Sequence, residues 1–284
     1  MRVVVCGVRG STPAPGPEFV RYGGNTSCVA IASDGDEFPT LVLDAGTGLQ
    51  RLSGLMCGRP FRGTLLIGHL HWDHTHGLPF FAAGDRPDSD VTVVVPAQED
   101  DAESLLRRVM SPPHFPIQPS QLRGQWRFAG LDCGERTIEG FDVVARDIPH
   151  KGGRTLGFRI TDQSGATLAY LSDHGPRSMG PGPDGLGEYH QAARDLVEGV
   201  DLLIHDAQHT AAEFASKADL GHSAVDYAIG LAETCRVRQL LLFHHDPGRT
   251  DDELDTIVKG HRGASLAVSA AAEGDVHEIR GGGD

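Results

Sequence analysis

Short apolar runs, each bounded by turn-forming residues, recur along the whole chain. Runs of this length between Gly, Pro, Asp and Asn residues are typical of buried β-strands. We therefore expect strands at residues 2–8, 28–32, 40–43, 65–68, 91–95, 141–148, 156–161, 167–171, 201–204 and 239–243, with a short strand pair near the C-terminus.

Helical signals lie between these strands. Residues 78–83, 99–110 and 189–197 are expected to be helical. Ser223 with Asp226, and Thr250 with Glu253, match the capping box that opens many helices. The segment after Ser223 also carries an apolar stripe at helical spacing, which supports a helix there.

Two proline-rich segments, 9–17 and 111–119, cannot form regular structure. The second is either a linker or a rigid flap that brings His114 and Phe115 toward a cavity, and we favour the flap. The second half of the chain repeats the first in outline, and no linker or low-complexity tract separates the two. We therefore expect residues 1–284 to form one domain built of two similar halves.

The composition describes an ordinary globular protein, with 39% hydrophobic and 23% charged residues. Its net charge of −14 argues against a long nucleic acid as partner, because nucleic-acid binders usually display basic patches. The five cysteines are scattered, the apolar run after Met1 is too short for a secretory signal, and no stretch approaches a membrane span. We expect a cytoplasmic protein with a small-molecule substrate, either as a monomer or as a homodimer.

The most specific signal is His69-Leu70-His71-Trp72-Asp73-His74, directly after the apolar run 65–68. In an extended segment alternate residues share a face, so His69 and His71 can bind the same ion. Asp73 and His74 are adjacent and would point apart in a regular strand or helix, so the chain must turn there. Imidazole and carboxylate ligands suit zinc, and also manganese or iron. The sequence therefore predicts a metal site at the end of this strand.

The segment 69–77 resembles the HxHxDH signature of the metallo-β-lactamase superfamily. The resemblance implies an α+β fold, a four-layer αββα sandwich with metal ions between its two sheets. It also implies two sets of ligands: one metal bound by His69, His71 and His150, the other by Asp73, His74 and His244, with Asp173 bridging both. His245 is the alternative to His244, which we choose because it directly follows the apolar run 239–243.

Further segments resemble the phosphodiesterase branch of the superfamily, which includes ribonuclease Z and the cyclic phosphate phosphodiesterases. There the counterpart of Asp44 supports the histidine loop from behind. Asp206-Ala207-Gln208 and Gly221-His222-Ser223 resemble the Glu-Ala-Thr and Gly-His-Ser segments of ribonuclease Z. By this resemblance Asp206 orients His222, which donates a proton to the leaving alkoxide. The alternative is that both are structural residues.

These residues predict a metal-dependent hydrolase of a small phosphodiester, either a cyclic nucleotide or a cyclic sugar phosphate. Asp173 stands where secreted lactam-cleaving members carry Cys, which argues against antibiotic hydrolysis. The resemblance implies two divalent cations, expected to be zinc with manganese or iron as alternatives, that share a hydroxide nucleophile. Asp73 is then both ligand and catalytic residue, and Arg21, Lys151 and Arg154 are the candidates for substrate binding.

Two alternative functions remain. A lactone or thioester hydrolase of the same fold would not need a proton donor for a poor alkoxide leaving group, so His222 argues against it. A non-hydrolytic protein, such as a diiron redox domain or a metal sensor, is the alternative from another class. Redox relatives usually carry Glu where this chain has His71, together with a flavin domain.

Overall fold

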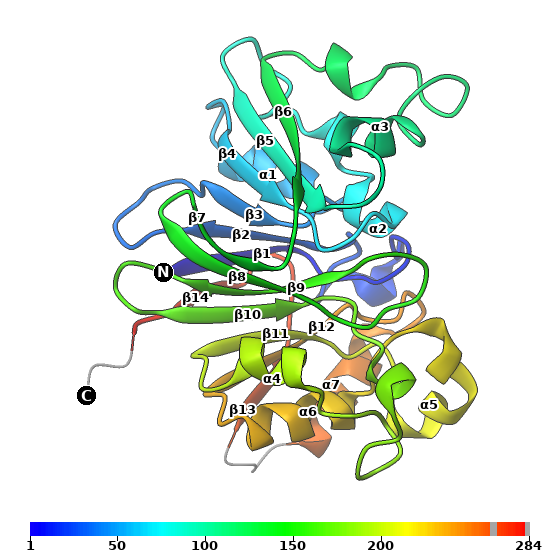
Figure 1. Ribbon diagram of the computed structural model, residues 1–284. Helices are drawn as coiled ribbons and strands as arrows, with labels where there is room; N and C mark the ends of the chain where they lie inside the picture. The colour runs from blue at the N-terminus through cyan, green and yellow to red at the C-terminus, as the bar shows by residue number, and fades with distance from the viewer. Residues whose placement is uncertain (262–265, 282–284) are drawn as a thin grey trace.

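Two seven-stranded sheets form the centre of the computed structural model, which describes residues 1–261 and 266–281 (Figure 1). The first sheet has the strand order β14 (Val276–Glu278), β1 (Arg2–Gly7), β2 (Cys28–Ala32), β3 (Leu41–Leu43), β4 (Arg62–Leu66), β5 (Asp90–Pro96) and β6 (Gln125–Leu131). The second has the order β13 (Ala267–Ala270), β12 (Gln239–Phe243), β11 (Leu202–Asp206), β10 (Thr167–Leu171), β9 (Leu156–Thr161), β8 (Phe141–Asp147) and β7 (Gly134–Ile138).

Helices cover the outer faces of both sheets. They are α1 (Leu49–Leu55), α2 (Trp72–Thr75), α3 (Ala102–Arg107), α4 (Gln191–Val197), α5 (Ala211–Lys217), α6 (Val225–Thr234) and α7 (Asp251–Gly260). Helices α1 and α3 pack on the first sheet, whereas α4 and α6 pack on the second. None of the described helices is long and apolar enough to cross a membrane.

The side chains of β10 show how the layers are held together. Leu168 and Tyr170 point into the core between the two sheets, and Ala169 and Leu171 point toward the helices on the other side. Both faces of the strand are therefore buried, which explains why it reads as a continuous apolar run. A third apolar cluster lies between the first sheet and its helices. The predicted α+β, four-layer αββα sandwich is confirmed.

The strand directions bring several strand ends to one edge of the second sheet. β10, β11 and β12 run parallel to one another, and β8 is antiparallel to β9, which is antiparallel to β10. The carboxyl ends of β8, β10, β11 and β12 therefore lie at the same edge. Every residue of the second sheet that the sequence selected for chemistry lies at or just after one of these ends.

Several predicted helices differ from those observed. The helix predicted at 99–110 spans only Ala102–Arg107, with Asp101 accepting a hydrogen bond from Ser104 N as its cap. Only a short 3₁₀ turn, Leu78–Phe80, forms within 78–83, where Pro79 lacks an amide hydrogen. The prediction of a capping box at Ser223 is wrong. The Ser223 hydroxyl donates to the carbonyl of His174 over 2.6 Å, and the helix begins after Ala224. The capping box at Thr250 is confirmed.

The proline-rich segment 111–119 does not reach the candidate ligands. His114 and Phe115 line a cavity of about 310 Å³ together with His76 and Met110, and the Phe115 ring packs edge-on against Phe80. The residues of the HxHxDH motif that are expected to bind metal do not line this cavity. The segment is folded against its neighbours as expected of a flap, but it does not bring these side chains to the metal cluster.

Candidate metal centre

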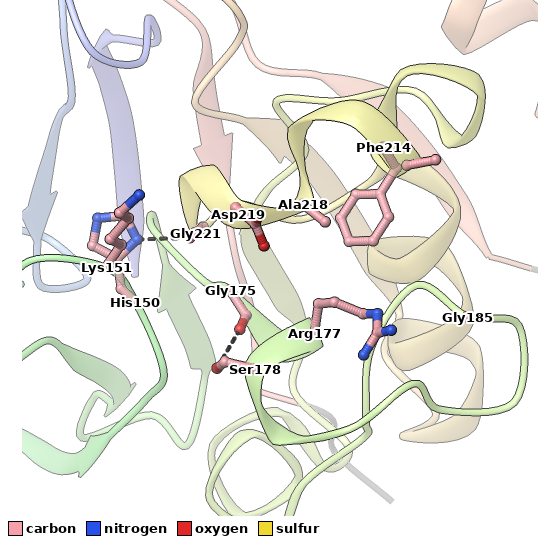
Figure 2. A pocket seen from close by; sticks show the side chains of 11 residues that line it. His150, Lys151, Gly175, Arg177, Ser178, Gly185, Phe214, Ala218, Asp219 and Gly221 are labelled. Atoms are coloured by element: carbon pink, nitrogen blue, oxygen red, sulfur yellow. Dashed lines mark hydrogen bonds between the residues drawn. The ribbon is translucent and has the colours of Figure 1, made fainter.

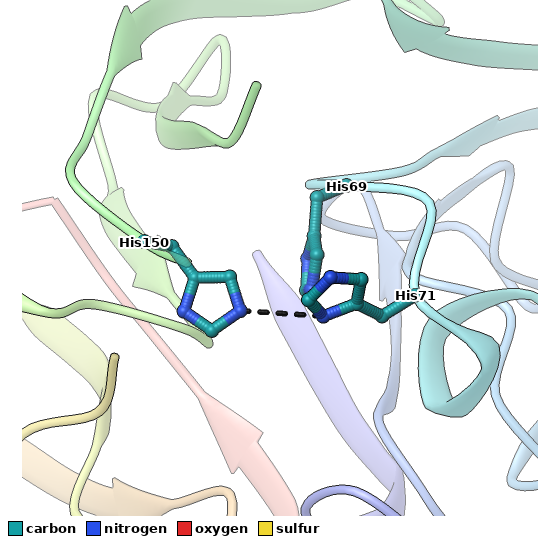
Figure 3. A group of neighbouring side chains, drawn as sticks. All are labelled: His69, His71 and His150. Atoms are coloured by element: carbon teal, nitrogen blue, oxygen red, sulfur yellow. Dashed lines mark hydrogen bonds between the residues drawn. The ribbon is translucent and has the colours of Figure 1, made fainter. Parts of the chain in front are cut away.

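Three histidines from two loops form a first cluster. His69 and His71 follow β4 and His150 follows β8, and their candidate ligand atoms all lie within 4.8 Å of one another (Figure 3). His150 donates from Nδ1 to the carbonyl of Gly221 over 2.7 Å, which leaves the lone pair of Nε2 facing the cluster, 3.3 Å from His71 Nδ1. Both ring nitrogens of His69 are buried without a hydrogen-bond partner.

A second cluster contains Asp73, His74, Asp173 and His244. The expected turn after His71 is the single helical turn α2, and it directs both Asp73 and His74 inward. His244 Nε2 lies 3.1 Å from Asp73 Oδ2. His245, the alternative ligand, lies outside this cluster, because its Nε2 donates to the carbonyl of Ala271 over 2.9 Å.

Asp173 faces both clusters with different oxygen atoms. Its Oδ1 lies 3.8 Å from His69 Nε2 and 3.6 Å from His150 Nε2. Its Oδ2 lies 3.0 Å from His74 Nε2 and 3.3 Å from His244 Nε2. Among the described residues, Asp173 Oδ2 and His74 Nε2 are buried without a hydrogen-bond partner, so both atoms are available to a cation.

The protonation states fit a divalent metal site. Burial lowers the pKa of His69, His71 and His150, so these imidazoles are neutral and can offer lone pairs. Burial opposes ionisation of Asp173, but His244, His74 and His69 outweigh it and hold the pKa of this carboxyl well below its usual range. Burial alone would lower the pKa of the His74 imidazole. The nearby carboxylates of Asp73, Asp173 and Asp44 outweigh burial and raise this pKa well above its usual value. The carboxylates thus favour positive charge here, which a divalent ion supplies.

Asp44 holds the ligand loop from behind, as the resemblance implied. Its Oδ1 accepts from Gly68 N, and its Oδ2 accepts from His74 Nδ1 and from the hydroxyl of Tyr170, each over 2.7 Å. Because Asp44 follows β3 and Tyr170 lies on β10, this carboxylate joins the two sheets at the site. The hydrogen bond at Nδ1 leaves Nε2 of His74 as the atom that faces the cluster.

Two residues of the site adopt a left-handed backbone. Asp44 has φ +60° and His244 has φ +56°. Side chains other than Gly, Asn, Asp and His rarely adopt this conformation. At His244 the chain leaves β12 and turns at once, so the imidazole enters the cluster directly from the strand end.

Asp206 and His222 form a pair beside the clusters. His222 Nδ1 donates to Asp206 Oδ2 over 2.9 Å and lies 3.7 Å from Asp173 Oδ1. Asp206 is fixed in turn by the backbone amides of His174 and Gln208. Burial lowers the pKa of His222, but the carboxylates of Asp206 and Asp173 raise it to about 9. The imidazole therefore carries a proton at neutral pH.

The three basic residues predicted to bind substrate lie in different places. Lys151 lines the cavity of about 510 Å³ onto which His71, Asp73, Asp173 and His222 open. Arg154 lines a smaller cavity behind His69 and His71, but ion pairs hold its guanidinium to Asp132 and Asp147. Arg21 pairs with acidic residues of α7, Asp251, Asp252 and Asp255, and the structure does not bring it to the metal cavity.

The metal cavity also contains residues that sequence reasoning missed. Ser11 donates its backbone amide to Asp73 Oδ2 over 2.7 Å and lines the cavity. Trp72 and Leu220, both large apolar side chains with exposed fractions of 62% and 51%, lie at the same cavity. Trp72 could have been identified from the sequence as a cavity residue. A large aromatic side chain inside a polar metal-binding motif is expected at the surface, where exposed apolar groups often mark binding sites.

Comparisons with known proteins agree with this architecture. Residues 41–245 match the family model described as "Beta-lactamase superfamily domain". A ribonuclease Z from Geobacillus kaustophilus is 26% identical over an alignment that covers 78% of this chain and 82% of the relative.

Solved structures show the same fold. The metallo-β-lactamase fold protein YhfI from Bacillus subtilis superposes with a TM-score of 0.70 at 19% identity, covering 98% of this chain and 99% of that one. A diphosphatase from the PhnP family gives a TM-score of 0.67 at 16% identity, with coverage of 98% and 97%. The chain belongs to the metallo-β-lactamase superfamily and is a metal-dependent hydrolase that resembles ribonuclease Z.

Proposed function

We propose that this protein hydrolyses a small phosphodiester with two divalent metal ions, zinc by our proposal, bound at the two clusters. The observation that carries the proposal is Asp173, whose two oxygens face different sets of histidines. One set is His69, His71 and His150, and the other is His74 and His244 with Asp73. A carboxylate in this position suits a bridge between two ions.

The two ions would supply positive charge for the phosphoryl oxygens and lower the pKa of a water molecule in the cavity. The protein's own groups would do the rest. The carboxylate of Asp73, held by Ser11 N, is placed to orient the attacking water. Lys151 lines the same cavity and would bind a non-bridging phosphate oxygen, while Trp72 and Leu220 narrow the entrance.

His222 would complete the reaction as the acid. The attacking water would lose a proton to solvent as its oxygen forms the bond to phosphorus. The bond from phosphorus to the alcohol oxygen would break at the same time, and that oxygen would take the proton of His222, which solvent would then restore. Asp206 binds Nδ1 and so leaves the opposite nitrogen as the donor. An alcohol is a poor leaving group without such a proton, whereas the thiolate of a thioester leaves without one. The charged His222 therefore favours a phosphodiester over a thioester.

The names of similar proteins support the same class of substrate. The ribonuclease Z relative and the PhnP-family diphosphatase are both named for cleavage of bonds to phosphorus. The net charge of −14 makes a small diester a better candidate than a long polyanion such as transfer RNA.

A substrate panel tests the proposal. The protein, loaded with zinc or with manganese, is assayed on bis(p-nitrophenyl) phosphate, on 2′,3′- and 3′,5′-cyclic nucleotides, and on a lactone, a thioester and a β-lactam. Hydrolysis of at least one diester, with slow or undetectable turnover of the other classes, is the expected result. Much faster turnover of a lactone, thioester or lactam than of any diester would show that the phosphodiesterase assignment is wrong.

A further inference from the structure

A second cavity, of about 720 Å³, adjoins the metal cavity (Figure 2). The two cavities share His150 and Lys151 as wall residues. Gly221, which directly precedes the proposed proton donor His222, also lines the second cavity. A substrate whose reacting bond lies at the metals can therefore extend past Lys151 into this space, on the side from which the leaving oxygen receives its proton.

The passage between the cavities is a close backbone junction. Gly221 has φ +90°, and a Cβ atom at this position would lie 2.9 Å from Cβ of Lys151. The carbonyl of Gly221 also accepts the hydrogen bond from His150 Nδ1. The junction thus sets the position of Lys151 relative to a proposed metal ligand, and any side chain at residue 221 would displace it.

The wall of the second cavity offers charged groups that have no partner within the protein. Lys151, Arg177 and Asp219 take part in no ion pair or side-chain hydrogen bond among the residues that the structure describes. Arg154, by contrast, forms ion pairs with the carboxylates of Asp132 and Asp147. Figure 2 shows Arg177 and Asp219 at the wall of this cavity, with Arg177 extending beneath the ring of Phe214 toward Gly185 and Asp219 lying between Gly221 and Ala218.

This combination selects among small diesters. A second phosphate or carboxylate would be attracted by Lys151 and Arg177 but repelled by Asp219. A plain alkyl group would leave all three charges unused. A nucleobase satisfies Arg177 and Asp219 together, because its edge carries both hydrogen-bond acceptors and N–H donors. The volume lies within the range of small-ligand sites.

We propose that the second cavity binds the nucleobase of a cyclic mononucleotide, with Arg177 donating to acceptor atoms of the base and Asp219 accepting from its N–H groups. This inference rests on the proposed function. The inference goes beyond the proposed function in two ways. It selects a cyclic nucleotide over a cyclic sugar phosphate as the substrate, and it names the residues that would confer this specificity. Arg177 and Asp219 are specificity residues, since neither lines the metal cavity.

Paired substrates with and without a base test the inference. The cyclic nucleotide that the protein cleaves best is compared with the methyl riboside cyclic phosphate of the same ring size, in which a methoxy group replaces the base. The wild-type protein should favour the nucleotide in kcat/KM by tenfold or more. Arg177→Met and Asp219→Ala should each raise KM for the nucleotide by about tenfold, because each removes a hydrogen bond to a charged group. Neither variant should change kinetics on the methyl riboside.

Arg194→Met is the matched control, because Arg194 is exposed on α4 and lines neither cavity. It should leave both substrates unaffected. Calorimetric titration with the nucleoside monophosphate product gives a second readout, in which Arg177→Met should weaken binding by a similar factor. Equal kcat/KM for the paired substrates, or equal effects of the variants on both, would overturn the inference while leaving the proposed function intact. If the metal-loaded protein cleaves no diester at all, the proposed function itself fails.

Discussion

Nδ1 of His222 donates a hydrogen bond to Oδ2 of Asp206 over 2.9 Å. Burial lowers the pKa of His222, but Asp206 and Asp173 outweigh it and raise the pKa to about 9, so the imidazole is charged at neutral pH. The pair comes from different elements, Asp206 from the end of β11 and His222 from the loop before α6. A charged imidazole held in this way is suited to donate a proton, and its importance must depend on how much the leaving oxygen needs one.

The first prediction concerns this dependence. His222→Ala should lower kcat/KM on a cyclic nucleotide by about 10²–10⁴-fold, the usual range for general acid catalysis. The loss on bis(p-nitrophenyl) phosphate should be far smaller, because nitrophenolate leaves without a proton. Asp206→Asn should show the same pattern more mildly. Both substrates are measured at matched metal loading.

Metal content decides between the two roles that His222 could have. His222 also lies within 4.8 Å of Asp206 and His244 through its possible ligand atoms. If it is the acid, His222→Ala retains the wild-type metal content. Loss of metal, or an equal loss of activity on both diesters, would contradict the proton-donor role.

The second prediction concerns Asp173. Asp173→Asn should reduce bound metal from two ions per chain toward one and lower activity at the same time. The amide replaces one of the two oxygens, each of which faces one cluster, and removes the negative charge. Elemental analysis after gel filtration measures the stoichiometry. His76→Ala is the control: His76 is exposed and stacks on Trp72, so its loss should leave both ions in place. A wild-type protein that holds a single ion after metal supplementation would rule out the bridge.

The third prediction concerns the hydrogen bond from Tyr170 to Asp44 between the sheets. Tyr170→Phe removes a buried donor from a carboxylate that also holds His74. The free energy of unfolding in urea should fall by about 1.5–3 kcal/mol, the usual value for a hydrogen bond to a charged group.

Tyr22→Phe is the matched control for this loss. The Tyr22 hydroxyl donates to Asp255 over 2.9 Å, but the residue is only half-buried, so removal of this hydroxyl should cost less, about 1 kcal/mol or below. Equal losses in the two variants would show that burial of the Asp44 network contributes nothing special to stability.

The fourth prediction concerns acid stability. Burial alone would raise the pKa of Glu213, but hydrogen bonds from Arg249 and from the backbone and hydroxyl of Thr210 lower it to about 2, from an ordinary value of 4.5. The folded state therefore binds fewer protons than the unfolded state between these values. The contribution of Glu213 to stability is fully present above about pH 4.5 and is lost as the pH falls toward 2.

Glu213→Gln isolates this contribution. The variant should be less stable than the wild type at neutral pH, and the difference should shrink as the pH falls from 4.5 toward 2. Urea unfolding at a series of pH values measures it. A difference that stays constant across this window would mean that Glu213 acts through packing or helix capping rather than through its charge.

The clustering of the candidate ligands could be predicted from the sequence because these residues directly follow strand ends. His69, His71, Asp73 and His74 are close in sequence, so a single turn decides their geometry. His244 was separable from His245 because only the residue next to the apolar run leaves the strand facing the cluster. The capping box predicted at Ser223 does not form, because its hydroxyl is bound by a residue far away in the sequence. This hydroxyl donates to the carbonyl of His174, which follows β10.

Other parts of the structure leave no local trace in the sequence. Strands β6 and β7 were missed because their side chains are largely exposed, so no apolar run marks them. Arg21 was expected near the metals, but three carboxylates on α7, far away in the sequence, bind it elsewhere. Arg177 and Asp219 likewise meet only in the folded chain, and neither lies in a motif.

The left-handed backbone at His244 limits how the metal preference of this site can be changed. An exchange of donor atoms at residue 244 succeeds only with a side chain that accepts φ near +56°. Asp and Asn accept it most readily. Glu and Cys do so at a cost in strain, as Glu139 at φ +51° and Cys57 at φ +50° show in this chain. The conformation thus favours oxygen donors on a short side chain over thiolate. Protein engineering or natural drift at this position is therefore directed toward harder ions such as manganese, and away from soft, thiolate-bound metals.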